Sequence, residues 1–374
     1  MSWMAAEIAA RGGAVPFDEY MELALYHPAQ GYYASDTVRY GRAGDFLTAP
    51  TASGWYARVV ARLLRKIAAE RGRLRLADAA SGDGSFLEKL LESFGVDAGE
   101  VIAEVISVER SPAMRSLQSE RLAQAPVAVR MIRGVEQLGR FPGPTVIHAS
   151  EFYDAQPVTR VVGRRGGLRE QWVIAPEGRL EWQEKPARTE VVAYFERHGV
   201  VLEEGQIAEA NLGAATVHRR LLAAVGEQGL ALVLDYGYET RRLYDARGRR
   251  GGSLATFHRH RVGRDPLENP GEVDLTAHVN WDDLRHAADA EGWVEVGLWP
   301  LAEFLVRAGI EQELADRGLG MEAELDADTV TARQEVKRLL DPEGMGSDLK
   351  VLVQAKGEMV ETARSVLSFE LPAR

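Results

Sequence analysis

Short apolar runs alternate with helical patterns along most of the chain. This alternation predicts a parallel β-sheet with helices packed on both of its faces. A strand is expected over residues 73–78, followed by a turn of small residues and an amphipathic helix over 86–94. Further strands are expected over 101–108, 127–132, 145–149 and 230–234, and a further helix over 113–122.

The last third of the chain narrows the fold class. A helix is expected over residues 281–291 and strands over 293–299 and 349–355, with mostly helical residues between the two strands. Five parallel strands closed by a late pair, one of them antiparallel, are typical of class I SAM-dependent methyltransferases. The sequence therefore predicts an α/β fold with a Rossmann-like core, a seven-stranded, mostly parallel sheet, to which an N-terminal arm and insertions are added.

The remaining segments are expected to elaborate this core. Residues 158–182 alternate between apolar and polar positions with Gly-rich breaks, which indicates a small β-meander. Residues 236–280 are rich in Gly, Arg, His and Pro and have little periodicity, which indicates a functional loop. The expected order is an N-terminal helical arm with an aromatic loop (1–60), the first part of the core (61–157), the meander insertion (158–210), a core helix and the fifth strand (211–238), a substrate-side loop (239–280), a core helix and the sixth strand (281–299), a helical insertion (300–347), and the last strand with a tail (348–374).

Composition and charge exclude several classes of function. The 374 residues carry 45 Lys and Arg against 56 Asp and Glu, a net charge of −11, which does not indicate nucleic-acid binding through overall charge. The absence of Cys excludes disulfides, zinc–thiolate sites and a cysteine nucleophile, and we expect no metal site. No stretch approaches the about 18 apolar residues of a membrane span, and the start lacks the pattern of a secretion signal. We therefore expect a cytoplasmic protein that binds neither membranes nor nucleic acids.

A glycine-rich turn, Asp78-Ala-Ala-Ser-Gly82-Asp-Gly84, lies where the first expected strand meets its helix. Gly82 and Gly84 permit a close backbone approach, and the start of the helix favours a carboxylate such as the methionine end of S-adenosylmethionine. Asp78 is a candidate to hold the amino-acid part of this cofactor. The alternative is a tight turn that binds no ligand.

Glu109 ends the second expected strand, where a carboxylate can accept hydrogen bonds from two ribose hydroxyls. An NAD site would need the same acid, but Leu87 stands where the dinucleotide fingerprint has its third glycine. The adenine is expected beside Val135 and Glu136 after the third strand, on position alone.

Ser150, Glu151 and Asp154 follow the fourth expected strand, which in this layout faces the transferred methyl group, and Ser150 and Glu151 are candidate cofactor-binding residues. Methyl transfer is an in-line attack that depends on alignment more than on a covalent enzyme intermediate. Glu151 and Asp154 are candidate catalytic residues that can orient a cationic acceptor, and capping of the next turn is the alternative for Asp154. Asp274 and His278 are further substrate-side candidates, with a structural role as the alternative.

The chain resembles the MidA-type SAM-dependent methyltransferases over nearly its whole length. The matches follow in order at residues 17–21 (FDEYM), 25–28 (LYHP), 44–50 (GDFLTAP), 108–112 (VERSP), 151–158 (EFYDAQPV), 235–238 (DYGY) and 270–279 (PGEVDLTAHV). Mitochondrial members of this family assist respiratory complex I assembly and dimethylate an arginine of one of its subunits. The resemblance implies S-adenosylmethionine as the cofactor, S-adenosylhomocysteine as its product, and a protein arginine as the leading candidate acceptor.

The N-terminal segment is expected to close over the cofactor. Gly44 and Asp45, which are candidate cofactor-binding residues, lie in a segment with Tyr26, Tyr33 and Phe46, and aromatic faces attract a sulfonium cation. The alternative is an aromatic cluster that packs the arm onto the core.

The chain also departs from the residues that are usual in this family. Asp78 and Ala80 stand where glutamate and glycine are usual, and residues 56–58 read Tyr-Ala-Arg where Phe-Gly-Glu is usual. The acceptor therefore stays open as a nitrogen or oxygen on a protein, a peptide or a small molecule. A tailoring methyltransferase of natural products and a non-catalytic scaffold protein that keeps the fold are the two rival functions. A homodimer is a further expectation that the sequence leaves open.

Overall fold

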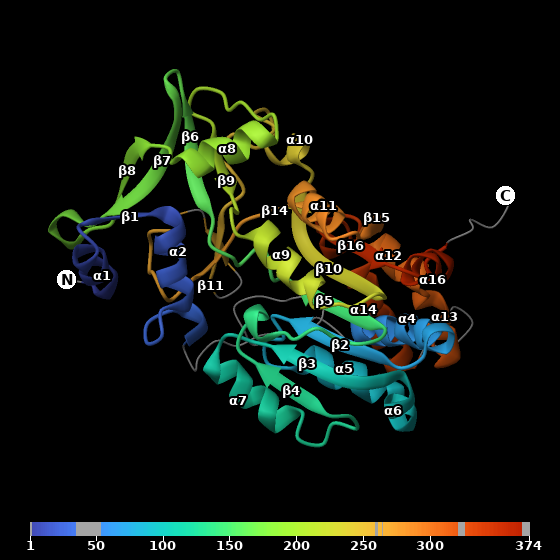
Figure 1. The fold of residues 1–374 in the computed structure, drawn as a ribbon. Helices are drawn as coiled ribbons and strands as arrows, with labels where there is room; N and C mark the ends of the chain where they lie inside the picture. Colours follow the sequence, from blue (N-terminus) through green and yellow to red (C-terminus); the bar gives the residue numbers. More distant parts are fainter. Residues whose placement is uncertain (1, 35–53, 259–260, 264, 321–325, 369–374) are drawn as a thin grey trace.

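A large, mostly parallel β-sheet forms the centre of the molecule (Figure 1). The computed structural model describes residues 2–34, 54–258, 261–263, 265–320 and 326–368. Seven of the eight strands form one path, in the order β15 (Val294–Pro300), β16 (Leu349–Lys356), β10 (Gly229–Tyr238), β5 (Thr145–Ser150), β2 (Leu74–Ala79), β3 (Ile102–Val108) and β4 (Val129–Ile132). The short β14 (Val279–Asn280) pairs with the end of β10.

The pairing directions confirm the predicted fold class. Strands β10, β5, β2, β3 and β4 are parallel neighbours, whereas β16 is antiparallel to both β10 and β15. The observed strands agree with the predicted ranges to within about two residues, except that β10 continues to Tyr238. The extension has a physical reason, because the end of β10 gains a partner in β14.

Helices cover both faces of this sheet (Figure 1). Leu230, Leu232 and Leu234 of β10 face the helices on one side of the sheet, while Ala231 and Val233 face the helices on the other side. This period of two is what a strand buried on both faces requires. The helices around the sheet are α4 (Trp55–Arg71), α5 (Ser85–Phe94), α6 (Ala98–Val101), α7 (Pro112–Arg121), α9 (Ala214–Ala223), α11 (Trp281–Ala290), α12 (Leu301–Ala308), α13 (Ile310–Asp316), α14 (Ala327–Leu339), α15 (Met345–Asp348) and α16 (Met359–Val366).

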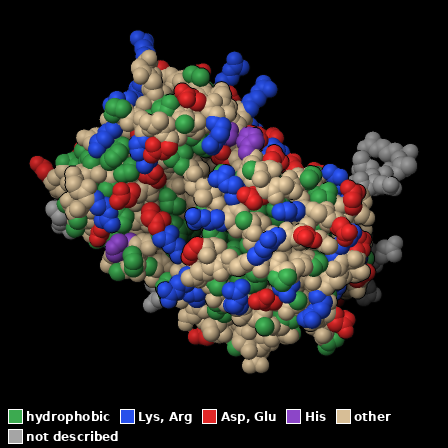
Figure 2. All heavy atoms as spheres, in the orientation of Figure 1, with side chains coloured by type: hydrophobic (Ala, Val, Ile, Leu, Met, Phe, Trp, Pro, Cys, Tyr) green, Lys and Arg blue, Asp and Glu red, His purple; other side chains and the backbone are tan. Residues whose placement is uncertain are grey.

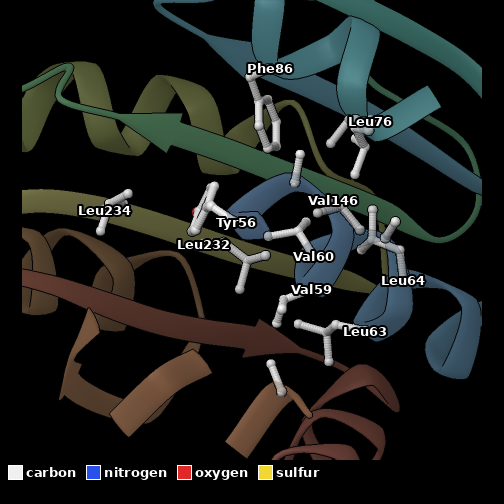
Figure 3. Close-up of a cluster of buried hydrophobic side chains, with 14 of the residues drawn as sticks. Tyr56, Val59, Val60, Leu63, Leu64, Leu76, Phe86, Val146, Leu232 and Leu234 are labelled. Carbon is white, nitrogen blue, oxygen red and sulfur yellow. The ribbon is translucent and has the colours of Figure 1, made fainter. Parts of the chain in front are cut away.

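The main core lies between α4 and the sheet. Figure 3 shows side chains of α4, among them Tyr56, Val59 and Leu63, directed at Leu232 and Val146 of the central strands. Tyr56 is fully buried although it carries a hydroxyl group. A buried hydroxyl requires a hydrogen-bond partner, and its partner is part of the candidate site.

A second, smaller sheet lies beside the core (Figure 1). The strands predicted as a meander are β6 (Thr159–Arg164), β7 (Gly167–Ile174) and β8 (Glu181–Pro186), and β1 (Ala14–Pro16) and β9 (Ile207–Ala210) complete five antiparallel strands. Helices α1 (Trp3–Ala10), α2 (Phe17–Tyr26) and α8 (Thr189–Arg197) belong to the same part. The N-terminal residues are therefore joined to the meander by backbone hydrogen bonds.

The expected segment boundaries differ from the observed elements in two places. Helix α4 runs from Trp55 to Arg71, so the boundary expected at residue 60 falls inside one core helix. Residues 239–280, expected as a loop, contain α10 (Thr240–Leu243) and a three-stranded antiparallel sheet of β11 (Ala255–His258), β12 (Arg261–Gly263) and β13 (Asp274–Thr276). These strands are too short to produce an alternating pattern in the sequence. In the described part of the chain no helix is both long and apolar enough to cross a bilayer.

Candidate active site

A cavity of about 560 Å³ lies at the carboxyl ends of β2, β3, β4 and β5. This edge of an open α/β sheet is where such folds bind their ligands. The lining includes seven residues that the sequence analysis assigned to the site, namely Asp78, Gly82, Glu109, Val135, Glu136, Ser150 and Glu151. Tyr26 and Tyr33 from the N-terminal part and Asn211 after β9 close the cavity from the other side.

The turn after β2 holds strained backbone. Ala80 has a φ of 58° and Gly82 a φ of 55°, so both residues are in the left-handed region, which is costly for alanine. Gly84 (φ 81°) starts α5, and a Cβ there would lie 3.0 Å from Cγ of Gln118. Gly84 is not part of the lining, and its left-handed backbone and the nearby Gln118 side chain give its glycine a structural reason, while the contact with the cofactor stays a prediction.

Glu109 connects two turns at the edge of the cavity. Its Oε2 accepts a hydrogen bond from Gly82 N (2.9 Å), and its Oε1 accepts one from Ser111 N (2.7 Å). Burial raises the pKa of Glu109 to about 7, although these two N–H groups and Arg115 oppose the shift. Each carboxylate oxygen retains further acceptor capacity, which suits the ribose hydroxyls.

Asp78 is held by a chain of buried side chains. Its Oδ1 lies 2.6 Å from His148 Nδ1, and His148 Nε2 lies 3.0 Å from the Tyr56 hydroxyl. The rings of Phe86 and His148 are stacked with centroids 4.1 Å apart. Sequence analysis missed His148 and Tyr56, because an apolar strand and an apolar helix face give no signal for a polar contact between them.

Three buried polar atoms of the lining residues test whether a polar ligand fits. Asp78 Oδ2, Ser150 Oγ and Gln156 Nε2 have no hydrogen-bond partner among the described residues. A buried polar atom without a partner costs free energy, so such atoms around one cavity indicate that a ligand completes their hydrogen bonds. A cofactor with an amino-acid end and an acceptor with polar hydrogens would supply these partners.

The loop after β5 is fixed by Asp235 at the end of β10. Asp235 Oδ2 accepts hydrogen bonds from Phe152 N (3.1 Å) and Tyr153 N (2.9 Å). Burial is the main cause that raises the pKa of Asp235, and the charge of Glu151 raises it further, to about 7. Glu151 itself has a φ of 49° and lines the cavity. A residue with a side chain rarely adopts this conformation, and Asp235, which fixes the neighbouring amides, is a supporting residue that the sequence analysis did not single out.

The other substrate-side candidates do not reach the lining. Asp154 is buried, with its Oδ1 unpartnered in the described part, and burial followed by Asp235 and Asp274 raises its pKa well above the usual range. Asp274 is also buried and accepts a hydrogen bond from the Tyr33 hydroxyl at 3.0 Å. The structure thus places Asp154 and Asp274 behind the cavity wall rather than on its surface.

His278 is also away from the lining. Its Nδ1 accepts a hydrogen bond from Arg249 Nη1 (2.9 Å), and its ring lies against Tyr238. Burial and the neighbouring Arg249 charge lower its pKa to about 4, so the ring is neutral near pH 7. Gly44 and Asp45 lie outside the described residues, as does Phe46. No group of three or more His, Cys, Asp or Glu side chains in the described ranges could hold a metal ion.

The N-terminal aromatic residues lie at the cavity. Tyr26 and Tyr33 are stacked with centroids 5.4 Å apart, and the Tyr26 hydroxyl donates to Ala155 O at 2.9 Å. The Arg110 guanidinium carbon lies 4.3 Å from the centroid of the Tyr26 ring, and the guanidinium also pairs with Glu22. These contacts tie α2 to the loops after β3 and β5.

Comparisons with known proteins agree with this geometry. Residues 56–298 match the family model Methyltransf_28, which describes S-adenosyl-L-methionine-dependent methyltransferases. The crystal structure of a COG1565 superfamily member from Burkholderia thailandensis bound to S-adenosyl-homocysteine superposes with a TM-score of 0.82 and 30% identity, covering 95% of this chain and 91% of that chain.

Two curated relatives carry a named activity. The Drosophila melanogaster protein arginine methyltransferase NDUFAF7 homolog, mitochondrial, is 27% identical, over 92% of this chain and 82% of its own. The Homo sapiens protein arginine methyltransferase NDUFAF7, mitochondrial, is 27% identical, over 81% of this chain and 71% of its own.

These names correct the expected location. We expected a cytoplasmic protein, but the fly and human relatives are named mitochondrial, which points away from the cytoplasm. The expectation relied on the absence of Cys and of a secretion signal, and neither feature distinguishes the two compartments.

Proposed function

The chain belongs to the S-adenosyl-L-methionine-dependent methyltransferase family Methyltransf_28, and we propose that the group it methylates is an arginine side chain of a protein. The observation that carries the proposal is the place of Glu151, an acidic residue with left-handed backbone that lines the cavity directly after β5. A guanidinium is a cation with a pKa above 12, so a carboxylate at the acceptor position favours its binding and orientation. The names of the curated relatives support the same acceptor.

The lining residues divide into two groups in this proposal. Asp78 and Glu109 hold the amino-acid end and the ribose of the cofactor, and Val135 and Glu136 lie beside the adenine. The cofactor supplies a methyl group on a positively charged sulfur. Ser150 and Gln156 offer polar groups that lack partners among the described residues, and they would bind either cofactor or acceptor atoms on the Glu151 side.

Glu151 has two tasks in the transfer. It accepts hydrogen bonds from the guanidinium and thereby fixes one nitrogen in line with the methyl group. When the N–C bond forms and the S–C bond of the sulfonium breaks, S-adenosylhomocysteine would leave as the neutral thioether. The negative charge of Glu151 would then offset the positive charge that develops on the guanidinium until the methylated nitrogen loses a proton to water. Asp235 contributes indirectly, because it holds the Phe152 and Tyr153 amides that set the conformation of this loop.

Substitution of Glu151 tests the proposal. We expect Glu151→Gln to lower the rate of methyl transfer at least about 100-fold, because removing a charge that acts in the transition state costs several kcal/mol. Binding of S-adenosylhomocysteine, measured by isothermal titration calorimetry, should change by less than about threefold, since uniform binding is not affected.

Glu177 provides a matched control. It is also a glutamate with left-handed backbone (φ 51°), but it lies in the turn between β7 and β8, outside the cavity lining. Glu177→Gln should transfer methyl groups at the wild-type rate. Equal rates for Glu151→Gln and the wild type would remove Glu151 from the acceptor site.

A further inference from the structure

We propose that His148 and Tyr56 are positioning residues for the cofactor, which fix the carboxylate of Asp78 so that its free oxygen receives the α-ammonium group of the amino-acid end. This inference rests on the cofactor site described above. It gives a role to His148 and Tyr56, which do not follow the end of a core strand and so were not expected at the site.

One direction of donation uses every group of the hydrogen-bond chain, with the ring proton of His148 assigned to Nδ1. Tyr56 is a proton donor, because burial and the charges of Asp78 and Glu151 raise the pKa of its hydroxyl far above the usual value. The hydroxyl donates to His148 Nε2 over 3.0 Å, and His148 Nδ1 donates to Asp78 Oδ1 over 2.6 Å. Each hydrogen of the chain is used once, and Asp78 Oδ2 is the acceptor that is left.

Packing prevents the chain from rearranging. Asp78, His148 and Tyr56 are 2%, 1% and 0% exposed, and they come from β2, β5 and α4. Phe86 of α5 stacks on the His148 ring at 4.1 Å and fixes its plane. The carboxylate is therefore held from one side by three elements of the core, while Asp78 and His148 both line the cavity.

The position of the free oxygen determines the chemistry of its ligand. A buried carboxylate oxygen without a partner binds a cationic donor best, because the hydrogen bond is then assisted by charge. Within the cofactor, the α-ammonium group provides such a donor. Ligands without an amino-acid end, such as 5′-methylthioadenosine, have the same adenosine and thioether but cannot use this oxygen.

The test compares two ligands on four variants of the full chain. Dissociation constants for S-adenosylhomocysteine and 5′-methylthioadenosine are measured by isothermal titration calorimetry. We expect Tyr56→Phe to weaken S-adenosylhomocysteine about threefold to tenfold and His148→Leu about tenfold or more, since one and two hydrogen bonds of the chain are lost. Both variants should bind 5′-methylthioadenosine within about twofold of the wild type. His148→Gln, which keeps a donor near Asp78, should recover part of the loss.

A second buried tyrosine–histidine pair provides the control. The Tyr153 hydroxyl lies 2.7 Å from His218 Nδ1, and His218 Nε2 lies 2.8 Å from Gln354 Oε1, with neither Tyr153 nor His218 in the cavity lining. Tyr153→Phe removes the same kind of hydrogen bond and should leave the ratio of the two dissociation constants unchanged.

Equal weakening of both ligands in Tyr56→Phe and His148→Leu would overturn the positioning role, because a merely structural defect affects the whole cavity. Unchanged binding of S-adenosylhomocysteine in both variants would overturn it as well. The acceptor takes no part in these titrations. If the arginine proposal failed, the ratio of the two dissociation constants would still be expected to change in Tyr56→Phe and His148→Leu. If that ratio did not change, only the positioning roles of Tyr56 and His148 would be contradicted.

Discussion

At the scale of single residues, strained backbone lies at the cavity. Ala80 and Glu151 are two of the four described non-glycine residues with positive φ, and both line the cavity. This conformation costs an L-residue about 1–2 kcal/mol, and such strain persists where the surrounding structure imposes it. Both residues follow the last residue of a core strand, where the chain turns toward the ligand.

Replacement of Ala80 with glycine should stabilise the protein. Ala80→Gly removes the strain of the left-handed conformation but adds the conformational entropy of glycine in the unfolded chain, which leaves a net gain of about 0.5–1 kcal/mol. Urea denaturation measures this difference. Ala187→Gly, at a residue without positive φ, should instead lower the free energy of unfolding, and a loss of stability in Ala80→Gly would contradict the strain.

Glu109 should make the stability of the free protein depend on pH. Its folded-state pKa of about 7 lies above the ordinary 4.5, so the folded state binds more protons than the unfolded state between these values. Stability should therefore fall as pH rises from about 4.5 to about 7, by at most about 3 kcal/mol for this group. Thermal unfolding from pH 5 to pH 8 should show a flatter profile in Glu109→Gln, and parallel profiles would exclude this contribution.

The sequence placed acidic residues at the ends of core strands, and three of them line the cavity, while their roles toward cofactor and acceptor stay predictions. Asp78, Glu109 and Glu151 were predicted because the carboxyl ends of parallel strands meet at one edge of the sheet. Asp154 and His278 were assigned to the same site, but neither lines the cavity. A residue a few positions beyond a strand can turn away from the strand's end, and the sequence alone does not show this. His148 and Tyr56 were not predicted, because 92 residues separate them in the sequence.

At the scale of elements, the side chains between α4 and the central strands, among them those of β10, form part of the largest core cluster (Figure 3). Leu232 of β10 is fully buried in this cluster, whereas Val201 is 92% exposed. We expect Leu232→Ala to lower the free energy of unfolding by about 2–5 kcal/mol, because it leaves a cavity between helix and sheet. Val201→Ala should change it by less than about 0.5 kcal/mol. Equal denaturation midpoints for the two variants would contradict the observed packing.

The elements also differ in how well the sequence predicted them. The core strands were predicted because both of their faces are buried and their apolar runs are long. The strands β11, β12 and β13 were taken as loop, since each has three or four residues. Helix α4 was divided between two expected segments, because a helix that continues from one part of a chain into the core carries no boundary signal.

At the scale of the whole molecule, both parts contribute to one cavity. The core provides the strand ends, and the part built on the smaller sheet provides Tyr26 of α2, Thr159 of β6 and Asn211 after β9. Figure 2 shows both acidic and basic side chains on the visible face. Local groups such as Glu151, rather than an overall field, are therefore expected to select the acceptor.

The most direct test of the account is to identify the residue that receives the methyl group. The purified protein is incubated with methyl-labelled S-adenosylmethionine and a protein extract, and the labelled fraction is digested and analysed by mass spectrometry. The account predicts label on arginine side chains of a protein with the wild type and none with Glu151→Gln. Label confined to small molecules, or on no acceptor while S-adenosylhomocysteine still binds, would contradict it.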